Sequence, residues 1–281
     1  SMTQTSSRKV KVPVLNAANP AELFEAASLL RQGKLVAFPT ETVYGLGADA
    51  RSEAAVRAIF VAKGRPSDNP LIIHFRSMEA IRKSNIVAEI SPLAEILASK
   101  FWPGPLTMVL PRSENAKLAK TVHANLSSVA VRVPNNPVSL KLLEQVGEDV
   151  PIAAPSANIS GRPSPTRACH VVFDFETMAS EEQASLVGAV LDGDSSMSSA
   201  QSCEYGVEST VVDLTVSTPT ILRPGAISKE MLEEATGCTF VLHQPKGSTG
   251  YMQTESASVE APKAPGMKYR HYAPSMPVYI A

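Results

Sequence analysis

The stretch "KGRPSDNPLIIH", residues 63–74, places two cations beside two prolines. Lys63 ends a segment with helical spacing, and Gly64 and Pro66 stop that helix at once, which leaves Arg65 on a turn. A guanidinium on a rigid turn can bind two phosphate oxygens while a nearby ammonium acts as a point charge. The stretch therefore predicts an anion site, although a lysine in the last turn of a helix is equally explained by the helix dipole.

Further polar groups stand at the ends of apolar runs. Arg132 lies inside "SSVAVRVP" and needs a partner, either an internal carboxylate or that of a substrate, because an unpaired buried charge costs several kcal/mol. "PTETVYGLG" puts Thr40, Glu41 and Thr42 at the carboxyl end of a short strand, where ligands bind in open α/β sheets, although such hydroxyls also cap ordinary turns. His74 closes an apolar run and is either a core histidine or a contact to a small ligand.

The segment "PIAAPSANISGRPSPT" combines an apolar run with a compact loop of small polar residues. Hydroxyl and amide groups in such a loop can bind ribose or phosphate oxygens, but Ser, Asn, Gly and Pro also gather in ordinary loops. Polar groups at the edges of the later apolar runs "GVESTVVDL" and "ILRPG" repeat the pattern. The candidates in these three segments are Ser156, Asn158, Ser160, Ser164, Ser209 and Arg223.

Composition excludes several classes of protein. There is no phosphate-binding Gly-x-x-x-x-Gly-Lys-Ser/Thr motif, and Gly45-Leu46-Gly47 lacks the third glycine of a dinucleotide fingerprint, so we expect a structural turn there. A net charge of −1 argues against binding nucleic acid by bulk charge. Three cysteines without a Cys-x-x-Cys pair indicate neither a disulfide framework nor a zinc site. With no long apolar run and no signal-like N-terminus, we expect a cytoplasmic protein, or a mitochondrial one, without membrane contact.

Helices and strands are predicted to interleave, which favours an α/β domain with a mixed, twisted sheet. Gly33 and Ser52 supply stop and start signals for the first two helices. From about residue 244 to 263 the sequence is polar and aperiodic, as in a linker. The predicted helices span 18–33, 52–63, 92–100, 137–146 and 228–236, and the predicted strands lie within 34–39, 71–75, 101–111, 128–133, 152–155, 184–191, 209–215 and 219–225.

Seven segments, taken in this order, resemble the YrdC family of threonylcarbamoyl-AMP synthases: "AFPTETVYGLG", "KGRPSDNPLIIH", "WPGPLT", "VAVRVP", "PIAAPSANISGRPSPT", "GVESTVVDL" and "ILRPG". The resemblance covers residues 13–240 and implies one YrdC-like catalytic domain. "APGMKYRHYAP" looks like the linker of a longer subfamily with a small additional domain, so residues 241–281 are interpreted as the linker and the start of that domain, cut short.

The resemblance implies that L-threonine, bicarbonate or CO2, and ATP with Mg2+ give threonylcarbamoyl-AMP and pyrophosphate. A downstream transferase would then use the product to make N6-threonylcarbamoyladenosine in tRNA. The implied catalytic set is Lys63, Arg65, Ser156 and Asn158. The implied ATP-binding set is Lys63, Arg65, Asn69, Ser128, Ser156, Ser164 and Arg223, with His271 or Tyr272 folding over the nucleotide as part of a lid. The implied threonine-binding set is Thr42, His74, Arg132, Ala154 and Ser209, and no side chain is assigned to a metal.

Two other functions compete with this one. A YrdC-like module also occurs in hydrogenase-maturation carbamoyltransferases, which carry Cys-rich zinc segments that three scattered cysteines cannot supply. A non-catalytic module that binds double-stranded RNA or tRNA is the second alternative. The balanced charge argues against strong binding, and weak RNA affinity would fall steeply with salt.

Overall fold

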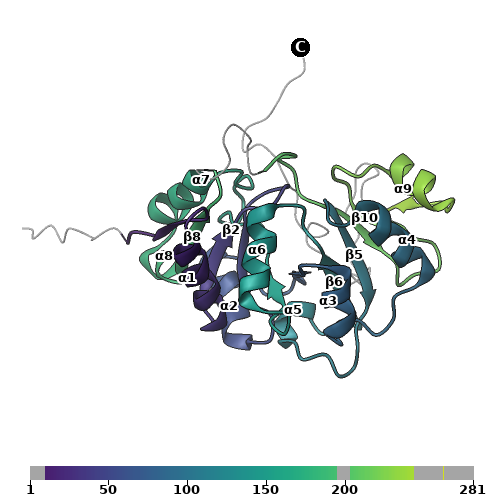
Figure 1. The fold of residues 1–281 in the computed structure, drawn as a ribbon, viewed down its shortest axis with the longest axis horizontal. Coiled ribbons are helices and arrows are strands. Elements are labelled where there is room, and N and C mark those ends of the chain that lie inside the picture. The colour runs from purple at the N-terminus through teal and green to yellow at the C-terminus, as the bar shows by residue number, and fades with distance from the viewer. Residues whose placement is uncertain (1–9, 195–202, 244–261, 263–281) are drawn as a thin grey trace, which may run out of the picture.

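The computed structural model describes residues 10–194, 203–243 and 262. Within them, eleven strands form one sheet in the order β1-β8-β2-β3-β7-β4-β6-β5-β9-β10-β11 (Figure 1). The strands are β1 (Val14–Asn16), β2 (Leu35–Phe38), β3 (Gly45–Asp49), β4 (Ile72–His74), β5 (Leu106–Pro111), β6 (Ser128–Arg132), β7 (Ile152–Ala153), β8 (Val187–Asp192), β9 (Thr210–Asp213), β10 (Thr220–Arg223) and β11 (Val241–Leu242).

The sheet contains both parallel and antiparallel pairs of neighbouring strands. The pairs β1–β8, β8–β2, β4–β6, β5–β9 and β10–β11 are parallel, and the remaining neighbours are antiparallel. The predicted α/β class with a mixed sheet is therefore confirmed. One register is important for the site: β4 and β6 run parallel with His74 opposite Arg132, which places these two side chains next to each other.

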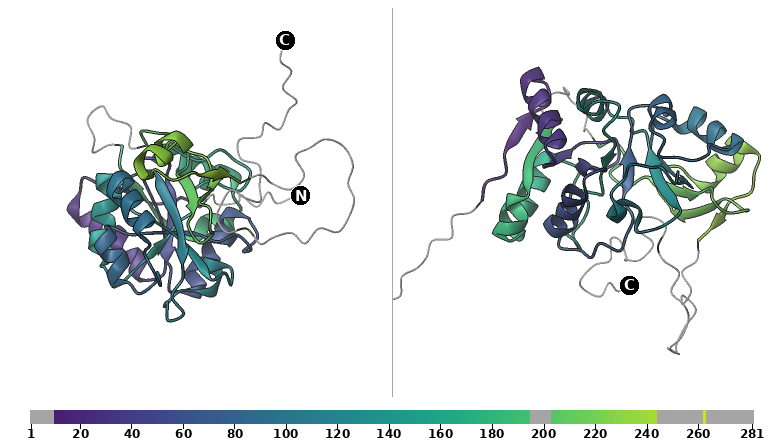
Figure 2. Two further views of the ribbon diagram at one scale, coloured as in Figure 1. Left: turned by 90° about the vertical axis from the view of Figure 1, so that its right-hand side faces the viewer. Right: turned by 90° about the horizontal axis from the view of Figure 1, so that it is seen from below.

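Helices cover both faces of the sheet, as the two further views in Figure 2 show. They are α1 (Pro20–Arg31), α2 (Glu53–Lys63), α3 (Met78–Lys83), α4 (Pro92–Phe101), α5 (Lys120–His123), α6 (Pro137–Val146), α7 (Ala168–Phe173), α8 (Glu181–Ser185) and α9 (Lys229–Thr236), with a π-helix, η1 (Asp174–Met178), after α7. In the part of the chain that the structure describes, no helix is long and apolar enough to cross a membrane.

Capping explains where the predicted helices begin. Asn19 accepts a hydrogen bond from Ala21 N at α1, and Ser52 accepts one from Ala55 N at α2, so a backbone donor without a helical partner is satisfied at each start. The apolar faces of α1 and α6 pack into one core cluster with β2 and β8, which includes Leu30, Phe38 and Leu142. The predicted positions of all five helices are confirmed within a few residues.

The predicted turn at Gly45-Leu46-Gly47 is wrong, because these residues begin the buried strand β3. The cause is close packing: a Cβ on Gly47 would lie 2.7 Å from the ring of Phe38 in β2. Glycine in this strand therefore lets a neighbouring aromatic ring approach the backbone. The sequence prediction also missed five short helical segments and two short edge strands, which are α3, α5, α7, η1, α8, β1 and β11.

The described strands extend from β1, which begins at Val14, to β11, which ends at Leu242 and pairs in parallel with β10. The predicted domain limits, residues 13 and 240, stay predictions. The predicted linker falls almost entirely outside the described residues, as do His271 and Tyr272 with the predicted lid.

Candidate active site

Lys63 is a buried lysine that holds the Ser156–Asn158 loop. It ends α2, and its side chain is 1% exposed. The Nζ atom donates to the backbone oxygen of Ser156, to that of Asn158 at 2.6 Å, and to Asn158 Oδ1 at 3.4 Å. Ser156 Oγ in turn donates to Asn158 Oδ1 at 2.6 Å. Three of the four predicted catalytic residues are therefore brought into one hydrogen-bonded cluster.

Burial changes the proton affinity of this lysine. Loss of water lowers the pKa of Lys63 well below its ordinary value, and the positive charge of Arg65 lowers it further. The carboxylates of Glu208 and Asp174 oppose this shift. Because the Nζ donors already point at oxygens of the Ser156–Asn158 loop, Lys63 acts in this structure as an internal clamp.

Arg65 lies on the turn that the sequence predicted. Gly64 caps α2 with a φ of 64°, a left-handed conformation that glycine adopts at little cost. The Arg65 guanidinium lies over the Phe60 ring, 5.2 Å from its centroid. Asn69 follows on the same turn, 1% exposed, and its Oδ1 has no hydrogen-bond partner among the described residues. The turn thus presents a cation and a buried acceptor next to the Lys63 cluster.

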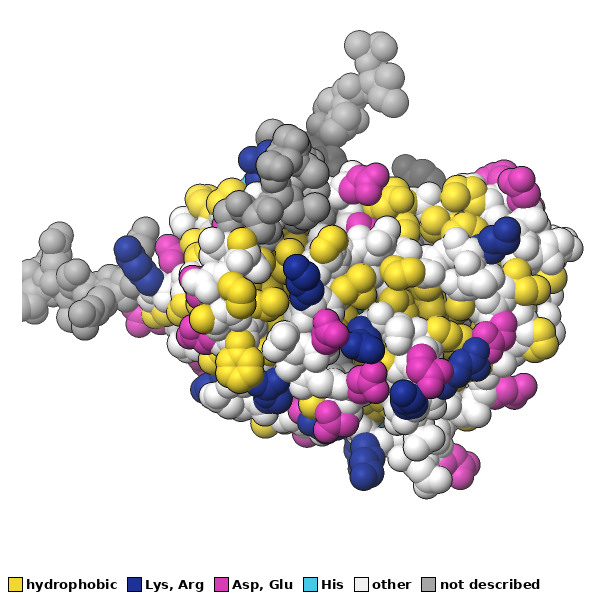
Figure 3. Space-filling view, viewed as in Figure 1, with side chains coloured by type: hydrophobic (Ala, Val, Ile, Leu, Met, Phe, Trp, Pro, Cys, Tyr) yellow, Lys and Arg dark blue, Asp and Glu magenta, His cyan; other side chains and the backbone are white. Residues whose placement is uncertain are grey.

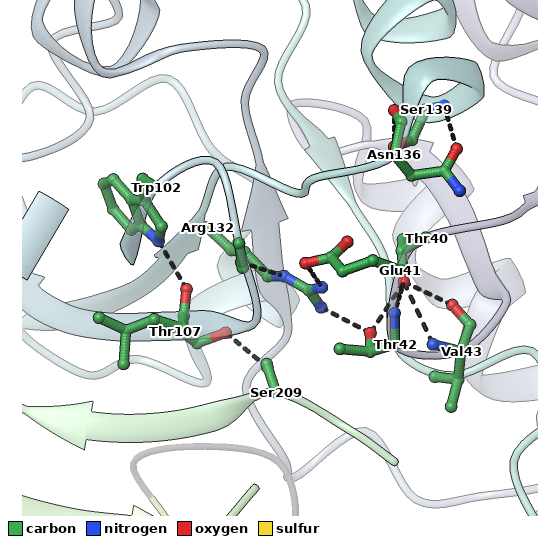
Figure 4. Close-up of polar contacts among 12 residues, drawn as sticks. Thr40, Glu41, Thr42, Val43, Trp102, Thr107, Arg132, Asn136, Ser139 and Ser209 are labelled. Carbon is green, nitrogen blue, oxygen red and sulfur yellow. Dashed lines mark hydrogen bonds and ion pairs between the residues drawn. The ribbon is translucent and has the colours of Figure 1, made fainter. Parts of the chain in front are cut away.

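Arg132 sits at the centre of a second buried cluster, drawn in Figure 4. Its NH2 donates to Glu41 Oε1 at 2.6 Å, its NH1 to Thr42 Oγ1 at 3.0 Å, and its Nε to the backbone oxygen of Gly104 at 3.3 Å. The side chains of Arg132 and Glu41 are 4% and 3% exposed. Of the two partners that the sequence left open, an internal carboxylate is present. A guanidinium has five N–H donors, so two remain after these three bonds.

His74 lies beside Arg132 and is uncharged at neutral pH. Burial lowers its pKa to about 3, and the neighbouring charge of Arg132 contributes to the shift. Its ring meets that of Phe38 edge-on, with centroids 6.0 Å apart. The His74 Nδ1 atom is buried and has no hydrogen-bond partner within the described segments. This histidine therefore offers an acceptor rather than a positive charge.

The pH dependence of stability tests this description of His74. Between pH 6.5 and pH 3 the unfolded chain binds a proton at this histidine and the native chain does not, so the free energy of unfolding falls as the pH falls, by up to roughly 1.4 kcal/mol per pH unit. His74→Asn should flatten the slope in denaturant titrations across this window. His123→Asn is the control, since burial lowers that pKa too, but less. An unchanged slope in His74→Asn would show that His74 is not buried in its neutral form.

Ser209 and Arg223 form a third polar group, and the charge of Arg223 interacts with the charges of Glu208 and Arg132. Ser209 precedes β9 and is 1% exposed, and its Oγ lies 2.8 Å from that of Thr107 in β5. Arg223, at the end of β10, donates to the backbone oxygen of Ser209 at 2.9 Å and to its Oγ at 3.2 Å. Burial lowers the pKa of Arg223 to about 10, so the guanidinium stays charged at neutral pH. One residue predicted for ATP therefore contacts one predicted for threonine.

Glu208 is a buried carboxylate next to Ser164. Ser164 Oγ donates to Glu208 Oε1 at 2.5 Å, and the charge of Glu208 acts on both Lys63 and Arg223.

The remaining predicted residues lie on the same sheet. Ala154 follows β7, with its N–H bonded to Ile72, and Ser128 begins β6, at the opposite end of that strand from Arg132.

Sequence reasoning did not assign Glu41 or Glu208 to the site. Both stand in segments that it singled out, "PTETVYGLG" and "GVESTVVDL". The signal for Glu41 was the buried Arg132, which requires a negative partner, but spacing in the chain did not say which acid would meet it. Sheet pairing brings Glu41 from the segment between β2 and β3 to the end of β6.

These features define an α/β protein whose mixed sheet carries a buried, charged site for small polar ligands, with a cationic turn on one side and a paired arginine on the other. A family model described as "Telomere recombination" (Sua5_yciO_yrdC) matches residues 28–225, and one described as "Threonylcarbamoyl-AMP synthase, C-terminal domain" matches residues 227–281. The chain belongs to the Sua5/YciO/YrdC family, as the sequence resemblance indicated.

The chain is similar in sequence to threonylcarbamoyl-AMP synthases of other organisms. The chain is 48% identical to the threonylcarbamoyl-AMP synthase of Pyrococcus abyssi over 91% of its own length and 66% of that protein, and 42% identical to that of Bacillus subtilis over 93% and 67%. The solved structure of P. abyssi Sua5 complexed with L-threonine superimposes with a TM-score of 0.77 at 46% identity, covering 93% of this chain and 69% of that one. This chain thus spans about two thirds of the length of these relatives.

Proposed function

We propose that this protein is an L-threonylcarbamoyladenylate synthase, which makes threonylcarbamoyl-AMP and pyrophosphate from L-threonine, bicarbonate or CO2, and ATP. The observation that carries the proposal is the pair of buried clusters. The charge of Arg65 acts on Lys63, while Arg223 holds Ser209 by hydrogen bonds and its charge interacts with that of Arg132. Such a site can bind an anionic nucleotide and an amino acid side by side. Relatives at 48% and 42% identity that carry the synthase name support the assignment.

We expect ATP to bind beside the Lys63 cluster and threonine beside the Arg132 cluster. Arg65, Arg223 and the Ser156–Asn158 loop would bind the ATP phosphates and ribose, with Asn69, Ser128 and Ser164 around them. The two remaining N–H donors of Arg132 would bind the carboxylate of threonine, with Thr42, His74, Ala154 and Ser209 around it. The complex of P. abyssi Sua5 with L-threonine supports a threonine site on this fold.

The chemistry requires positioning more than acid–base catalysis. The threonine nitrogen takes up CO2 to give a carbamate, and a carbamate oxygen then attacks the α-phosphorus of ATP and displaces pyrophosphate. Holding well-oriented reactants together lowers a barrier by roughly 7–11 kcal/mol. Arg65 and Arg223 would balance the charge that develops on the transferred phosphorus and the leaving pyrophosphate. Their attachment to Phe60 and Ser209 keeps both guanidinium groups in place before ATP binds.

Mg2+ would enter with ATP. It keeps several waters and binds through substrate phosphates and one or two carboxylates rather than through a dedicated protein cage. Among the described residues, Glu208 fits this pattern as one buried carboxylate beside Ser164. Glu208 would hold the ion, which would supply charge neutralisation at the phosphates.

An assay of pyrophosphate release tests the proposal. Release from ATP should require both L-threonine and bicarbonate, and the nucleotide product should be threonylcarbamoyl-AMP by mass spectrometry. Omitting threonine, or replacing it with alanine, should abolish release. Release that continues at the same rate without threonine would contradict the synthase assignment and leave an ATP hydrolase.

Handover of the product to a tRNA-modifying transferase belongs to this proposal, whereas an RNA-binding module without catalysis is the alternative to it. Figure 3 shows basic and acidic side chains interspersed on one face of the molecule. Among the described residues, Arg82 pairs with Glu95 and Arg76 with Glu144. This mixture does not favour a strong phosphate-binding surface there, so we prefer the synthase to the non-catalytic RNA-binding alternative. We propose a cytoplasmic or mitochondrial location, in keeping with the three free cysteines.

A further inference from the structure

Glu41 is a buried carboxylate with one oxygen paired and the other unpaired. Its Oε1 accepts the hydrogen bond from Arg132 at 2.6 Å. Its Oε2 is buried and has no hydrogen-bond partner among the described residues. A buried charged oxygen without a donor is costly, and such atoms in native proteins commonly have a functional reason. The structure therefore contains an unused anionic acceptor directly beside the arginine of the site.

The neighbouring polar groups do not supply that donor. Thr40 Oγ1 donates to the backbone oxygen of Val43 at 2.7 Å and lies 2.8 Å from Thr42 Oγ1, which accepts from Arg132. These hydrogen bonds leave Glu41 Oε2 without a donor, while Arg132 keeps two N–H donors that can face a carboxylate. His74 Nδ1 is a second buried polar atom without a partner among the described residues. The groups that an amino acid can direct at Glu41 Oε2 are its ammonium group and any side-chain hydroxyl.

Charge balance makes the same point. Arg132 and Glu41 form a neutral pair at the bottom of a site with 4% and 3% side-chain exposure. Threonine is a zwitterion at neutral pH, so it adds no net charge. When the carboxylate of threonine faces the free donors of Arg132 and its ammonium faces Glu41 Oε2, each charged group of threonine lies against a group of opposite charge. Any other orientation places like charges together in a region of low dielectric, where repulsion is strong.

We propose that Glu41 Oε2 binds the ammonium group of threonine and accepts the proton that this group must lose before it reacts with CO2. This inference rests on the proposed synthase function and names the residue that prepares its amino-acid substrate. Glu41 is suited to the role because the other side chains around the threonine site are hydroxyls, a methyl, a permanently charged arginine and His74. Burial and the neighbouring charge of Arg132 lower the pKa of His74, so this histidine takes up a proton poorly.

The proton step balances as follows. One N–H bond of the ammonium breaks, the proton bonds to Glu41 Oε2, and the electron pair stays on nitrogen, which gives a neutral amine and a neutral carboxylic acid. The amine electron pair then forms the N–C bond with CO2, and the nitrogen loses a second proton to water, so that the carbamate carries one negative charge. Glu41 returns its proton to water after the product leaves. No oxidant, reductant or other co-reactant is needed.

The test compares two ligands that differ at the nitrogen. Threonine carries an ammonium, whereas N-carbamoyl-L-threonine keeps the carboxylate and hydroxyl but has an uncharged nitrogen, in a shape close to that of the carbamate. Affinities are measured by calorimetry or by competition in the pyrophosphate assay, with wild type, Glu41→Gln and Glu41→Asp. Both variants keep an oxygen for Arg132, and melting curves verify that they fold.

Glu41→Gln should weaken threonine binding about tenfold or more while changing the affinity for N-carbamoyl-L-threonine by less than about threefold, and kcat at saturating threonine should fall. Glu41→Asp should recover part of the threonine affinity. If Glu41 only orients Arg132, both ligands carry the carboxylate and both must weaken by the same factor, which would overturn the proposal. Wild-type pyrophosphate release without threonine would instead contradict the synthase function itself.

Discussion

Replacing Arg132 with lysine is expected to raise the KM for threonine roughly 100-fold while leaving the KM for ATP within about twofold. Lysine keeps a positive charge for Glu41, so no buried carboxylate loses its counter-ion. A single ammonium cannot reproduce the planar fork that contacts Glu41, Thr42 and Gly104 and still offers two donors to a substrate. Losing two buried hydrogen bonds to the threonine carboxylate costs about 3 kcal/mol of binding free energy, which corresponds to the roughly 100-fold rise in the KM for threonine.

Steady-state kinetics with each substrate varied in turn measures this effect. Arg76→Lys is the matched control, because Arg76 is a surface arginine that pairs with Glu144 and Glu148 and is 37% exposed. Its replacement should leave both KM values unchanged, since exposed ion pairs contribute little. Equal increases in the KM for threonine and the KM for ATP in Arg132→Lys would contradict a carboxylate-binding role and indicate general damage to the site.

Lys63→Met is expected to lower kcat roughly 100-fold or more and to weaken ATP and AMP to a similar extent. Methionine fills a similar volume but leaves the oxygens of Ser156 and Asn158 without their donor in a buried position. Each such oxygen costs about 1–3 kcal/mol, so the Ser156–Asn158 loop should move and the melting temperature should fall. Displacing reacting groups by about 1 Å can reduce a rate 100-fold.

The comparison of nucleotides separates two roles for this lysine. If Lys63 binds the β- and γ-phosphates directly, as the family resemblance implied, Lys63→Met should weaken ATP and pyrophosphate but leave AMP unaffected. Equal losses for ATP and AMP are expected if it holds the loop. Lys83→Met is the control, since Lys83 is 60% exposed on α3 and pairs with Glu79 and Glu148 at 3.6 and 3.8 Å. Affinities by calorimetry and melting curves provide the readout.

Local sequence was sufficient for the elements whose signals lie within a few residues. Gly33, Ser52 and Gly64 give stop and start signals within their own turns, so α1 and α2 were predicted within two or three residues. The turn that carries Arg65 was predicted for the same reason. The seven polar segments, in their order along the chain, were also enough to predict the family. The family model that matches residues 28–225 confirms this prediction.

Strand β3 and the short helices could not be predicted locally. Gly45 and Gly47 have the composition of a turn, and they form a strand only because Phe38 and Ile152 from neighbouring strands pack on them. Such packing depends on the order of the sheet, in which β3 lies between β2 and β7. Tertiary contacts therefore overrode the local preference of glycine.

The amino-acid sequence by itself determined which chemical groups this protein has and the family to which it belongs: the cations of the turn, the buried arginine and the polar loop are visible as residue types at the ends of apolar runs. Only the tertiary structure decided which of them meet. Arg132 and Glu41 are 91 residues apart in the chain, and Lys63 and Asn158 are 95 apart. Pairing over such separations is set by strand order and register, because the free energy of a buried ion pair or clamp depends on geometry that residue types do not contain.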